Sequence, residues 1–194
     1  MSKGFTLLEL LIVIAILAIL TTVVILVMNP AESIKRARDT QRISDLDTLK
    51  TAIILYITEG NTDIKAETCN AASICYSGSG QTPSKNDGNG WIPINFTTMA
   101  GGSPLSHLPV DPVNTDTNRY SYAASGTDFE LATRMESAYY DYSTGKNKVG
   151  ANDGGNSGPL YEVGTKLDIF ECAVNDDCAD EVTNKTCTAG VCVL

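Results

Sequence analysis

The chain has 194 residues, of which 43% are apolar, and a formal net charge of −9. This length allows one domain with an appendage. After Thr58 the chain carries 18 acidic and 8 basic residues. This balance argues against a nucleic-acid partner, because phosphate backbones bind clustered Lys and Arg. It instead suits solubility outside the cell or the binding of a divalent cation.

The first predicted element is the apolar run of residues 5–28, in which Glu9 is the only charged residue. As a helix the run would be roughly 36 Å long at 1.5 Å per residue, enough to cross a bilayer core of about 30 Å. A cleaved secretory signal peptide is the alternative. We disfavour it because the run is longer, lacks a following Ala-x-Ala site, and carries an acid where a signal peptide has Lys or Arg. We therefore predict a transmembrane helix over residues 5–28.

A second helix is predicted directly after the first. Proline lacks an N–H and disfavours helix at the residue before it, so we expect a kink or a short melted turn at Pro30. Residues 29–58 predict an amphipathic helix, because apolar residues recur at steps of three and four, and Gly60 ends it. The expected buried face consists of Ile34, Ala37, Ile43, Leu46, Leu49, Ile53 and Ile57. The rest of the chain must cover this face.

Residues 59–119 are rich in Gly, Ser, Asn and Pro and predict a long variable loop. Its apolar anchors are Trp91, Ile92, Ile94 and Phe96. We assign Trp91 to the core and not to a ligand site.

Residues 120–170 predict an antiparallel sheet. Two strands are expected over residues 120–124 and 129–135, and a third within residues 160–169, after a loop over residues 143–159. In the second strand Phe129, Leu131, Thr133 and Met135 alternate with Glu130, Ala132 and Arg134. Such alternation is typical of a half-buried strand, so we expect its apolar side to cover the amphipathic helix.

Six cysteines behind an export signal indicate disulfides. They are Cys69, Cys75, Cys172, Cys178, Cys187 and Cys192. Zinc is the less favoured alternative, because the chain has no Cys-x-x-Cys pair and its only histidine, His107, lies far from the others in sequence. Residues 171–194 form a Cys-rich tail with too few large apolar residues for a core, so the tail needs covalent staples. Our hypothesis is a Cys69–Cys75 disulfide with interleaved Cys172–Cys187 and Cys178–Cys192 pairs.

Glu9 is the residue in the apolar run that needs an explanation. A charged side chain in a bilayer costs roughly 2.5 to 3.5 kcal/mol and is a functional candidate by default. Phe5 lies four residues earlier, on the same helix face. A cut after Gly4 would give Phe5 a charged amine, which could pair with a Glu9 carboxylate in its own chain or in a neighbour. Pairing between neighbours gives an open, head-to-tail interface that builds a helical filament. The alternative is that Glu9 reaches into water at the membrane interface.

The stretch Lys3-Gly4-Phe5-Thr6-Leu7-Leu8-Glu9-Leu10-Leu11-Ile12-Val13 resembles the N-terminal signature of type IV pilins and type II secretion pseudopilins. The resemblance implies an α+β, type IV pilin-like fold, in which a long N-terminal helix packs on a small antiparallel sheet. It implies that residues 1–4 are a leader peptide, that a prepilin peptidase cuts between Gly4 and Phe5, and that Phe5 is then N-methylated. It assigns Glu9 to filament assembly. The disulfide-rich tail is not part of the general family pattern, and we treat it as an extra surface module.

The resemblance also bears on orientation in the membrane. Lys3 precedes the apolar run, whereas Lys35, Arg36, Arg38 and Arg42 follow it. The positive-inside rule would therefore place the N-terminus outside. The resemblance implies the opposite, because the leader must face the cytoplasm. We expect a single-pass protein of the cytoplasmic membrane that later joins an extracellular filament on the cell surface.

The expected function is that of a major or minor pilin, a structural subunit of a type IV pilus-like filament that supports adhesion, twitching motility or DNA uptake. Its expected partners are other copies of itself in a helical polymer, the prepilin peptidase, the assembly platform and motor, and the membrane before assembly. One alternative is a pseudopilin of a type II secretion or competence piston, since Leu108-Pro109-Val110-Asp111-Pro112 is similar to major pseudopilins. Another is a membrane-anchored binding module whose disulfide-rich tail recognises a ligand.

No cofactor is expected, with calcium as the one candidate. Asn152, Asp153, Asp176 and Asp177 are oxygen donors in expected loops, and Ca²⁺ prefers such ligands, but their spacing forms no complete site. An enzyme is not expected either. Ser106, His107 and Asp111 lie close in sequence, yet no nucleophile elbow or phosphate-binding loop accompanies them.

Overall fold

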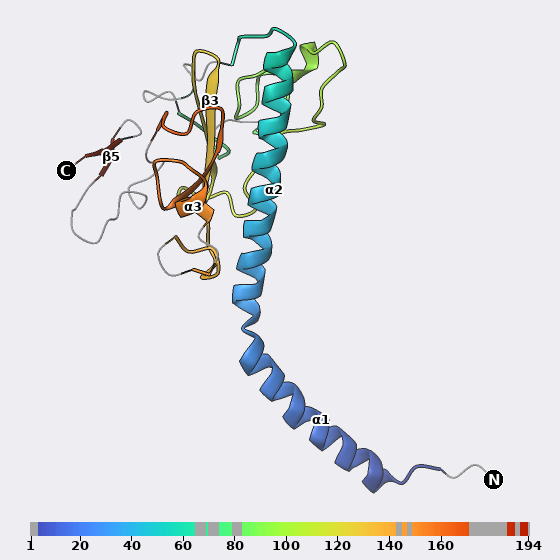
Figure 1. The fold of residues 1–194 in the computed structure, drawn as a ribbon. Helices are drawn as coiled ribbons and strands as arrows, with labels where there is room; N and C mark the ends of the chain where they lie inside the picture. The colour runs from blue at the N-terminus through green and yellow to red at the C-terminus, as the bar shows by residue number, and fades with distance from the viewer. Residues whose placement is uncertain are drawn as a thin grey trace.

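The computed structural model describes residues 4–64, 69, 74–78, 83–142, 145–146, 149–170, 186–188 and 191–193. Helices α1 (Leu7–Met28) and α2 (Pro30–Thr58) form a long, bent stalk (Figure 1). The described residues between 59 and 170, here called the head, lie beside the far part of α2. The chain therefore has the expected α+β architecture, with a long N-terminal helical part and a small antiparallel sheet.

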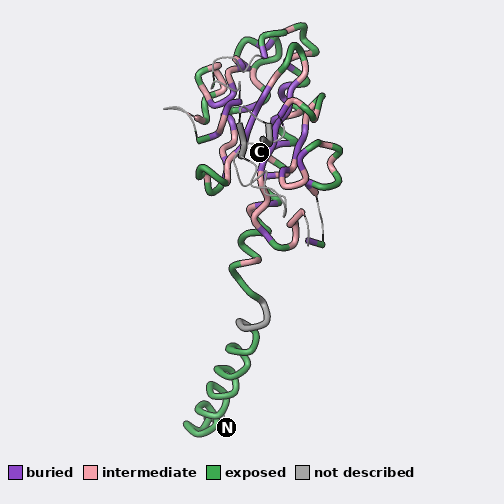
Figure 2. The backbone as a smooth tube through the Cα atoms, turned by 90° about the vertical axis from the view of Figure 1, so that its left-hand side faces the viewer, coloured by how far each residue is buried: buried purple, intermediate pink, exposed green. Residues whose placement is uncertain are grey.

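The rest of the chain leaves α1 uncovered. Its described side chains, from Leu7 to Val24, are all exposed, and Figure 2 shows this helix as an exposed rod that leads away from the head. The stretch Leu7–Val24 is long and apolar enough to cross a membrane. Because burial of apolar surface is favourable by roughly 25 cal/mol per Å², α1 requires a membrane or a protein partner around it.

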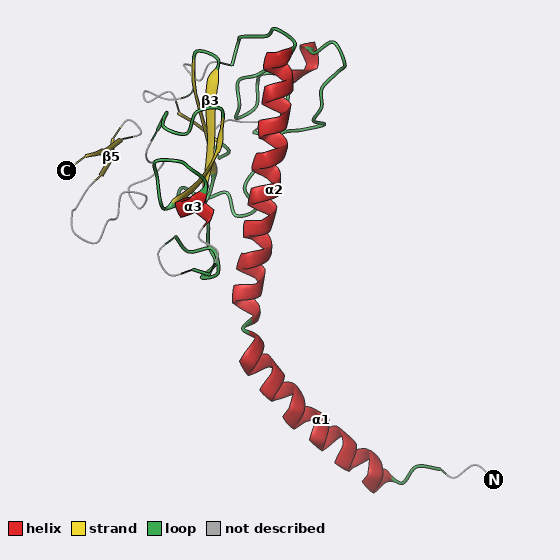
Figure 3. Cartoon of the chain, in the orientation of Figure 1, coloured by secondary structure: helices red, strands yellow, loops and turns green. Residues whose placement is uncertain are grey.

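The stalk bends at Asn29, the residue between the two helices (Figure 3). Asn29 has a φ of 38°, in the left-handed region that Asn tolerates better than most residues. Pro30 is the first residue of α2, where its missing N–H removes no helical hydrogen bond. The Oδ1 atom of Asn29 accepts the N–H of Glu32 at 3.4 Å. The predicted kink is thus the end of one capped helix and the start of another.

Four antiparallel strands form the sheet, in the order β1-β2-β3-β4. They are β1 (Ile74–Tyr76), β2 (Tyr120–Ser125), β3 (Asp128–Arg134) and β4 (Leu160–Gly164). The β2–β3 hairpin turns at Gly126, whose φ of 68° suits glycine. The predicted strands occur with nearly these bounds, although β4 ends well before residue 169. The expectation of loop alone before residue 120 was wrong for β1, which pairs with β2 so that Cys75 lies opposite Tyr122.

Shorter elements complete the described structure. They are the 3-10 helix η1 (Phe96–Thr98), the one-turn helix α3 (Val149–Asn152), and the strands β5 (Thr186–Thr188) and β6 (Val191–Val193). The region 143–159, predicted as loop, therefore contains a helical turn. β5 and β6 pair with each other in a separate two-stranded sheet.

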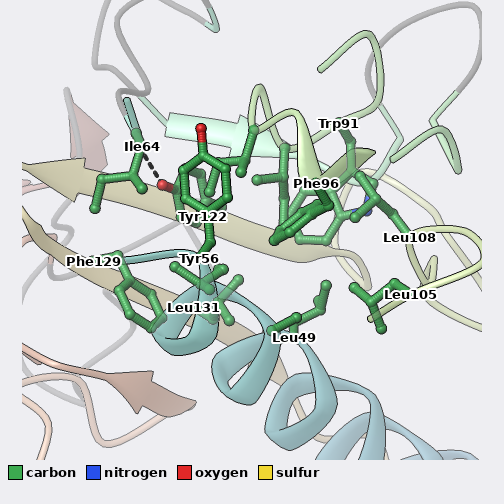
Figure 4. Close-up of a cluster of buried hydrophobic side chains, with 14 of the residues drawn as sticks. Leu49, Tyr56, Ile64, Trp91, Phe96, Leu105, Leu108, Tyr122, Phe129 and Leu131 are labelled. Atoms are coloured by element: carbon green, nitrogen blue, oxygen red, sulfur yellow. Dashed lines mark hydrogen bonds between the residues drawn. The ribbon is translucent and has the colours of Figure 1, made fainter. Parts of the chain in front are cut away.

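The main core lies between α2, one face of the sheet and the long segment before β2 (Figure 4). The helix contributes Leu46, Leu49, Ile53 and Tyr56, the sheet contributes Tyr120, Tyr122, Phe129 and Leu131, and the segment contributes Trp91, Ile92, Ile94, Phe96 and Leu108. Trp91 is 3% exposed, and its Nε1 donates a hydrogen bond to the Pro109 carbonyl at 2.8 Å. The assignment of Trp91 to the core is confirmed.

The opposite face of the sheet is also buried, which corrects the prediction of a half-buried strand. Ile74, Ala123, Ala132, Leu160 and Phe170 form a second apolar cluster. Phe129 and Leu131 do face the helix as expected, but Glu130 and Ala132 on the other side are 0% exposed. The chain after β4 folds back over this face. The alternation of residues within one strand cannot predict that a later segment covers its second face.

The buried face of α2 differs from the prediction in its first half. Leu46, Leu49 and Ile53 are buried as expected, whereas Ile34 is 56% exposed and Ala37 is exposed. In that half Asp39 and Arg42 are the buried residues. Polar contacts, and not apolar packing, therefore attach the first half of α2 to the head.

Candidate functional site

The Gly4–Phe5 peptide bond lies before the first helical turn. α1 starts at Leu7, and both Gly4 and Phe5 are exposed. A Cβ atom built on Gly4 would meet nothing within 4 Å. No described contact within the chain requires glycine at position 4. If glycine is required there, the reason is the fit to a molecule that acts on the Gly4–Phe5 bond. The predicted cleavage position is accessible.

Glu9 and Thr6 form a capping box at the start of α1, which the sequence analysis missed. The N–H of Glu9 donates to Thr6 Oγ1 at 3.2 Å, and the N–H of Thr6 donates to Glu9 Oε2 at 3.4 Å. The Thr6 hydroxyl also donates to Glu9 Oε2 at 3.3 Å. Thr-x-x-Glu before an apolar run is the recognised signature of this motif. The signal was thus present in the sequence.

The capping box places the Glu9 carboxylate beside the backbone where a new N-terminus would form. The carboxylate already accepts the Thr6 amide, and Phe5 is the residue directly before Thr6. A positive amine on Phe5 would lie near this carboxylate, which the positive end of the helix dipole stabilises. Pairing of the amine with the carboxylate, within one chain or between chains, stays a prediction.

A second polar cluster joins α2 to the head, and we call it the Arg42 junction. Arg42 is 0% exposed. Its Nε and Nη2 atoms donate to the Asp111 carboxylate at 2.6 and 2.9 Å, and its Nη1 donates to Asp39 at 2.7 Å. Arg42 and Arg38 both bind Glu136, the latter through Nη2 at 2.6 Å. Two cations thus face three carboxylates from three separate parts of the chain.

The charges of the Arg42 junction compensate one another. Burial alone would raise the pKa of Asp111, but the hydrogen bond and charge of Arg42 and the N–H groups of Asn114 and Val113 together hold that pKa below its usual range. Burial likewise opposes ionisation of Glu136, and hydrogen bonds from Arg38 and Arg42 lower its pKa. Asp39 accepts the N–H groups of Glu136 and Ser137 at 2.9 and 2.8 Å. Asp111 and Glu136 are therefore ionised at neutral pH, and the junction fixes the chain after β3 to α2.

An opposite situation holds for Glu130 and Glu162, on the sheet face away from α2. Glu130 is 0% exposed and Glu162 is 1% exposed. Burial, followed by the influence of the neighbouring Glu130 carboxyl group, raises the pKa of Glu162 to about 10. Glu130 Oε2 accepts the N–H groups of Ile169 and Phe170 at 2.8 and 3.2 Å. The pair therefore holds a proton at neutral pH and ties down the chain that leads into the tail.

The structure brings two of the three enzyme candidates, Ser106 and His107, together and gives Asp111 other partners. The side chains of Ser106 and His107 lie 2.9 Å apart on an exposed loop. Asp111 instead binds Arg42 and accepts the N–H groups of Val113 and Asn114.

Half of the calcium candidates lie in described positions. Asp153 accepts the N–H groups of Gly155 and Glu162 at 2.9 and 2.7 Å, and its neighbour Asn152 ends α3. Asp176 and Asp177 lie outside the described residues. Among the described residues no group of three His, Cys, Asp or Glu side chains could hold a metal ion.

One predicted disulfide is present, between Cys69 and Cys75, whose Cα atoms lie 4.9 Å apart. In the tail, the register of β5 and β6 sets Cys187 opposite Cys192. Cys172 and Cys178 lie outside the described residues, so the two interleaved tail pairs stay a prediction.

Comparison with known families matches residues 1–25 to the prokaryotic N-terminal methylation motif. No curated protein and no solved structure matches the chain significantly. The matched residues contain the Gly4–Phe5 bond, the Thr6–Glu9 capping box and most of α1.

Proposed function

We propose that the chain, whose residues 1–25 match the N-terminal methylation motif of prepilins, is a structural subunit of a type IV pilus-like filament, assembled through α1. In this proposal the prepilin peptidase removes residues 1–4 and Phe5 is N-methylated. An assembly platform and motor then move the subunit from the cytoplasmic membrane into an extracellular polymer. The chain needs no catalytic residue and no cofactor for this role.

The observation that carries the proposal is the uncovered state of α1 together with the carboxylate at its start. A helix whose described side chains are exposed and apolar gains free energy from a bilayer, and gains it equally from neighbouring copies of the same helix. Glu9 supplies the one charge in this apolar surface, and a neighbour's Phe5 amine would neutralise it. Both the membrane form and the filament form therefore bury the same surface.

A groove on the outer face of α2 supports contacts between neighbouring subunits. It is lined by Thr40, Ile43, Ser44, Asp47, Thr48, Thr51, Ala52, Leu55, Pro104 and Leu105. The hydroxyls of Thr40, Thr48 and Thr51 donate to carbonyls one turn earlier in α2, at 3.0, 2.8 and 2.9 Å. Since these donors are already satisfied, covering them with a neighbour leaves no unpaired hydroxyl proton.

The prepilin motif supports an orientation with the N-terminus in the cytoplasm. Lys35, Arg36, Arg38 and Arg42 follow the membrane span. The positive-inside rule, in which acidic residues count for little, would favour the opposite orientation. In our proposal the leader faces the cytoplasm, as the family resemblance implies, and the head lies outside.

The proposal is tested by Glu9→Ala in cells that express the full chain. We expect normal membrane insertion and leader removal, with failed or poor filament assembly. Thr6→Val is the matched control, because it removes the hydroxyl of the capping box but keeps the carboxylate. It should weaken the helix start by about 1 kcal/mol and still assemble. Normal assembly of Glu9→Ala would contradict the assigned role of Glu9.

Two further readouts separate the alternatives. Filaments visible on cells favour a pilus, whereas their absence with intact protein secretion or DNA uptake favours a pseudopilin piston. A membrane-anchored binding module would stay monomeric, and its Glu9→Ala variant would bind the ligand as well as the wild-type chain does. The mass of subunits from purified filaments reports leader loss, methylation of Phe5 and the number of disulfides together.

A further inference from the structure

The segment that follows β3, residues 136–142, is fixed to the lower part of α2, and we call it the Tyr139 loop. Glu32 Oε1 accepts the N–H of Tyr139 at 3.3 Å, and the guanidinium of Arg36 lies 4.1 Å from the centre of the Tyr139 ring. Glu136, the first residue of this loop, belongs to the Arg42 junction. In Figure 1 this orange segment is the part of the head nearest to α1.

The position of the Tyr139 loop relative to a membrane follows from helix geometry. Glu32 and Arg36 lie four and eight residues beyond Met28, about 6 and 12 Å along the helix at 1.5 Å per residue. The headgroup layer on each side of a bilayer core is roughly 5 to 8 Å thick. When α1 spans the core, Glu32 lies within this layer and the long side chains of Lys35 and Arg36 reach its outer part. Because Tyr139 contacts both Glu32 and Arg36, it lies at the same depth as the headgroup layer and its outer part.

The exposed side chains around the loop fit this layer. Lys35 and Arg36 are exposed, and Ile34 is 56% exposed. Tyr139 and Tyr140 are half-buried, with ring centres 4.9 Å apart. Tyr is enriched at membrane interfaces, and juxtamembrane Lys or Arg are attracted to anionic lipids by about 1 kcal/mol each.

The acidic groups near this loop are paired or half-buried. Glu136 and Asp39 bind Arg38 and Arg42. Glu32 accepts the Tyr139 amide and is half-buried, as is Asp141 in the loop itself. Among the described residues near this loop, Lys35, Arg36 and Lys146 are exposed cations, whereas the head as a whole is acidic.

From this placement we infer a membrane-docking surface. Before assembly the head rests on the phospholipid headgroups of the outer face of the membrane, through Ile34, Lys35, Arg36, Tyr139 and Tyr140. The occupant is the lipid surface, because the docking surface continues directly from the membrane-spanning helix and carries the charge that anionic phosphates attract. Docking limits the tilt of α2 relative to the membrane. It thereby fixes the orientation of the groove along α2 that is lined by Thr40, Leu55 and Leu105 among others. The inference rests on the proposed anchoring of α1, and not on filament formation.

Headgroup quenching in vesicles tests this inference. The full chain with Tyr140→Trp is reconstituted in phosphatidylcholine vesicles containing phosphatidylglycerol and a nitroxide on some lipid headgroups. We expect the added tryptophan emission to fall at least twofold. Leu55→Trp is the matched control, since Leu55 is 45% exposed near the far end of α2, and its emission should be unaffected. The emission of the wild-type chain comes from Trp91 alone, which is buried in the head, and it serves as the baseline.

Charge reversal tests the contribution of the cations. In the Tyr140→Trp chain, Lys35→Glu with Arg36→Glu should abolish most of the quenching. Lys85→Glu with Lys166→Glu makes the same change in net charge at exposed positions elsewhere on the head, and should preserve it. Equal quenching in both double variants, or equal quenching at positions 140 and 55, would overturn the inference. Protection of α1 from protease in the same vesicles shows that the helix has inserted. An inserted chain without quenching would contradict the docking surface alone. A chain that fails to insert would contradict the proposed function as well.

Discussion

The Arg42 junction and the Glu130–Glu162 pair are two polar clusters that contain buried carboxyl groups and have opposite electrostatics. At the junction Arg38 and Arg42 face Asp39, Asp111 and Glu136, and the pKa values of Asp111 and Glu136 fall. In the pair, two carboxyl groups face each other and the pKa of Glu162 rises to about 10. Burial penalises charge at both places, and only the junction supplies opposite charges within hydrogen-bond distance.

The difference teaches how this fold distributes polar contacts over the two faces of its sheet. Ion pairs fix the head to the stalk on the helix side, near the membrane end. A proton-holding pair fixes the returning chain on the other side, before the tail. The two clusters should therefore respond to pH in opposite directions, and the predictions below use that contrast.

The largest effect is expected from Arg42→Met. Removal of one partner from a buried ion pair leaves uncompensated charges and costs about 3 to 5 kcal/mol. The free energy of unfolding, from urea titration of the full chain in detergent at pH 7, should fall by this amount. The loss should shrink as the pH drops through the lowered pKa values of Asp111 and Glu136, because protonated partners no longer need the cation. A loss of less than about 1 kcal/mol would contradict the role of Arg42 as the centre of the junction.

A pH-dependent effect of intermediate size is expected from Glu162→Gln. The folded chain holds a proton that the unfolded chain releases above a pKa of about 4.3. Stability from this group is thus greatest below that value and falls as the pH rises toward the folded pKa of about 10. Glutamine keeps the shape without the titration, so unfolding curves at pH 5, 7 and 9 should lie closer together in the variant. Equal pH dependence of both chains would show that Glu162 is ionised in the fold.

The smallest effect is expected from Arg38→Ala. The Arg38 side chain is 30% exposed and binds Glu136 at 2.6 Å. Solvent screens such a pair, and exposed ion pairs contribute about 0 to 1 kcal/mol. The same urea titration should detect a loss within that range, since Glu136 keeps its contact with Arg42. A loss as large as that of Arg42→Met would mean that the junction depends equally on both cations.

Sequence reasoning was most successful where the information is local. The apolar run, the second helix and the strands of the β2–β3 hairpin follow from periodicities that each segment carries by itself. The Thr6–Glu9 capping box is equally local, since Thr-x-x-Glu before an apolar run is its signature. The short strand β1 gives a weaker signal, since three residues carry too little alternation to predict a strand.

Local sequence patterns are sufficient to predict a membrane-length helix with one carboxylate, an N-terminal methylation motif, and an amphipathic helix followed by antiparallel strands. These properties depend on residues within a few turns or one strand of each other. Only the tertiary structure decided that Arg42 is buried against Asp111 and Glu136, 69 and 94 positions away, and that Glu130 faces a covered side of the sheet. Both depend on where distant segments return, and hydrophobic periodicity within one element contains no information about that.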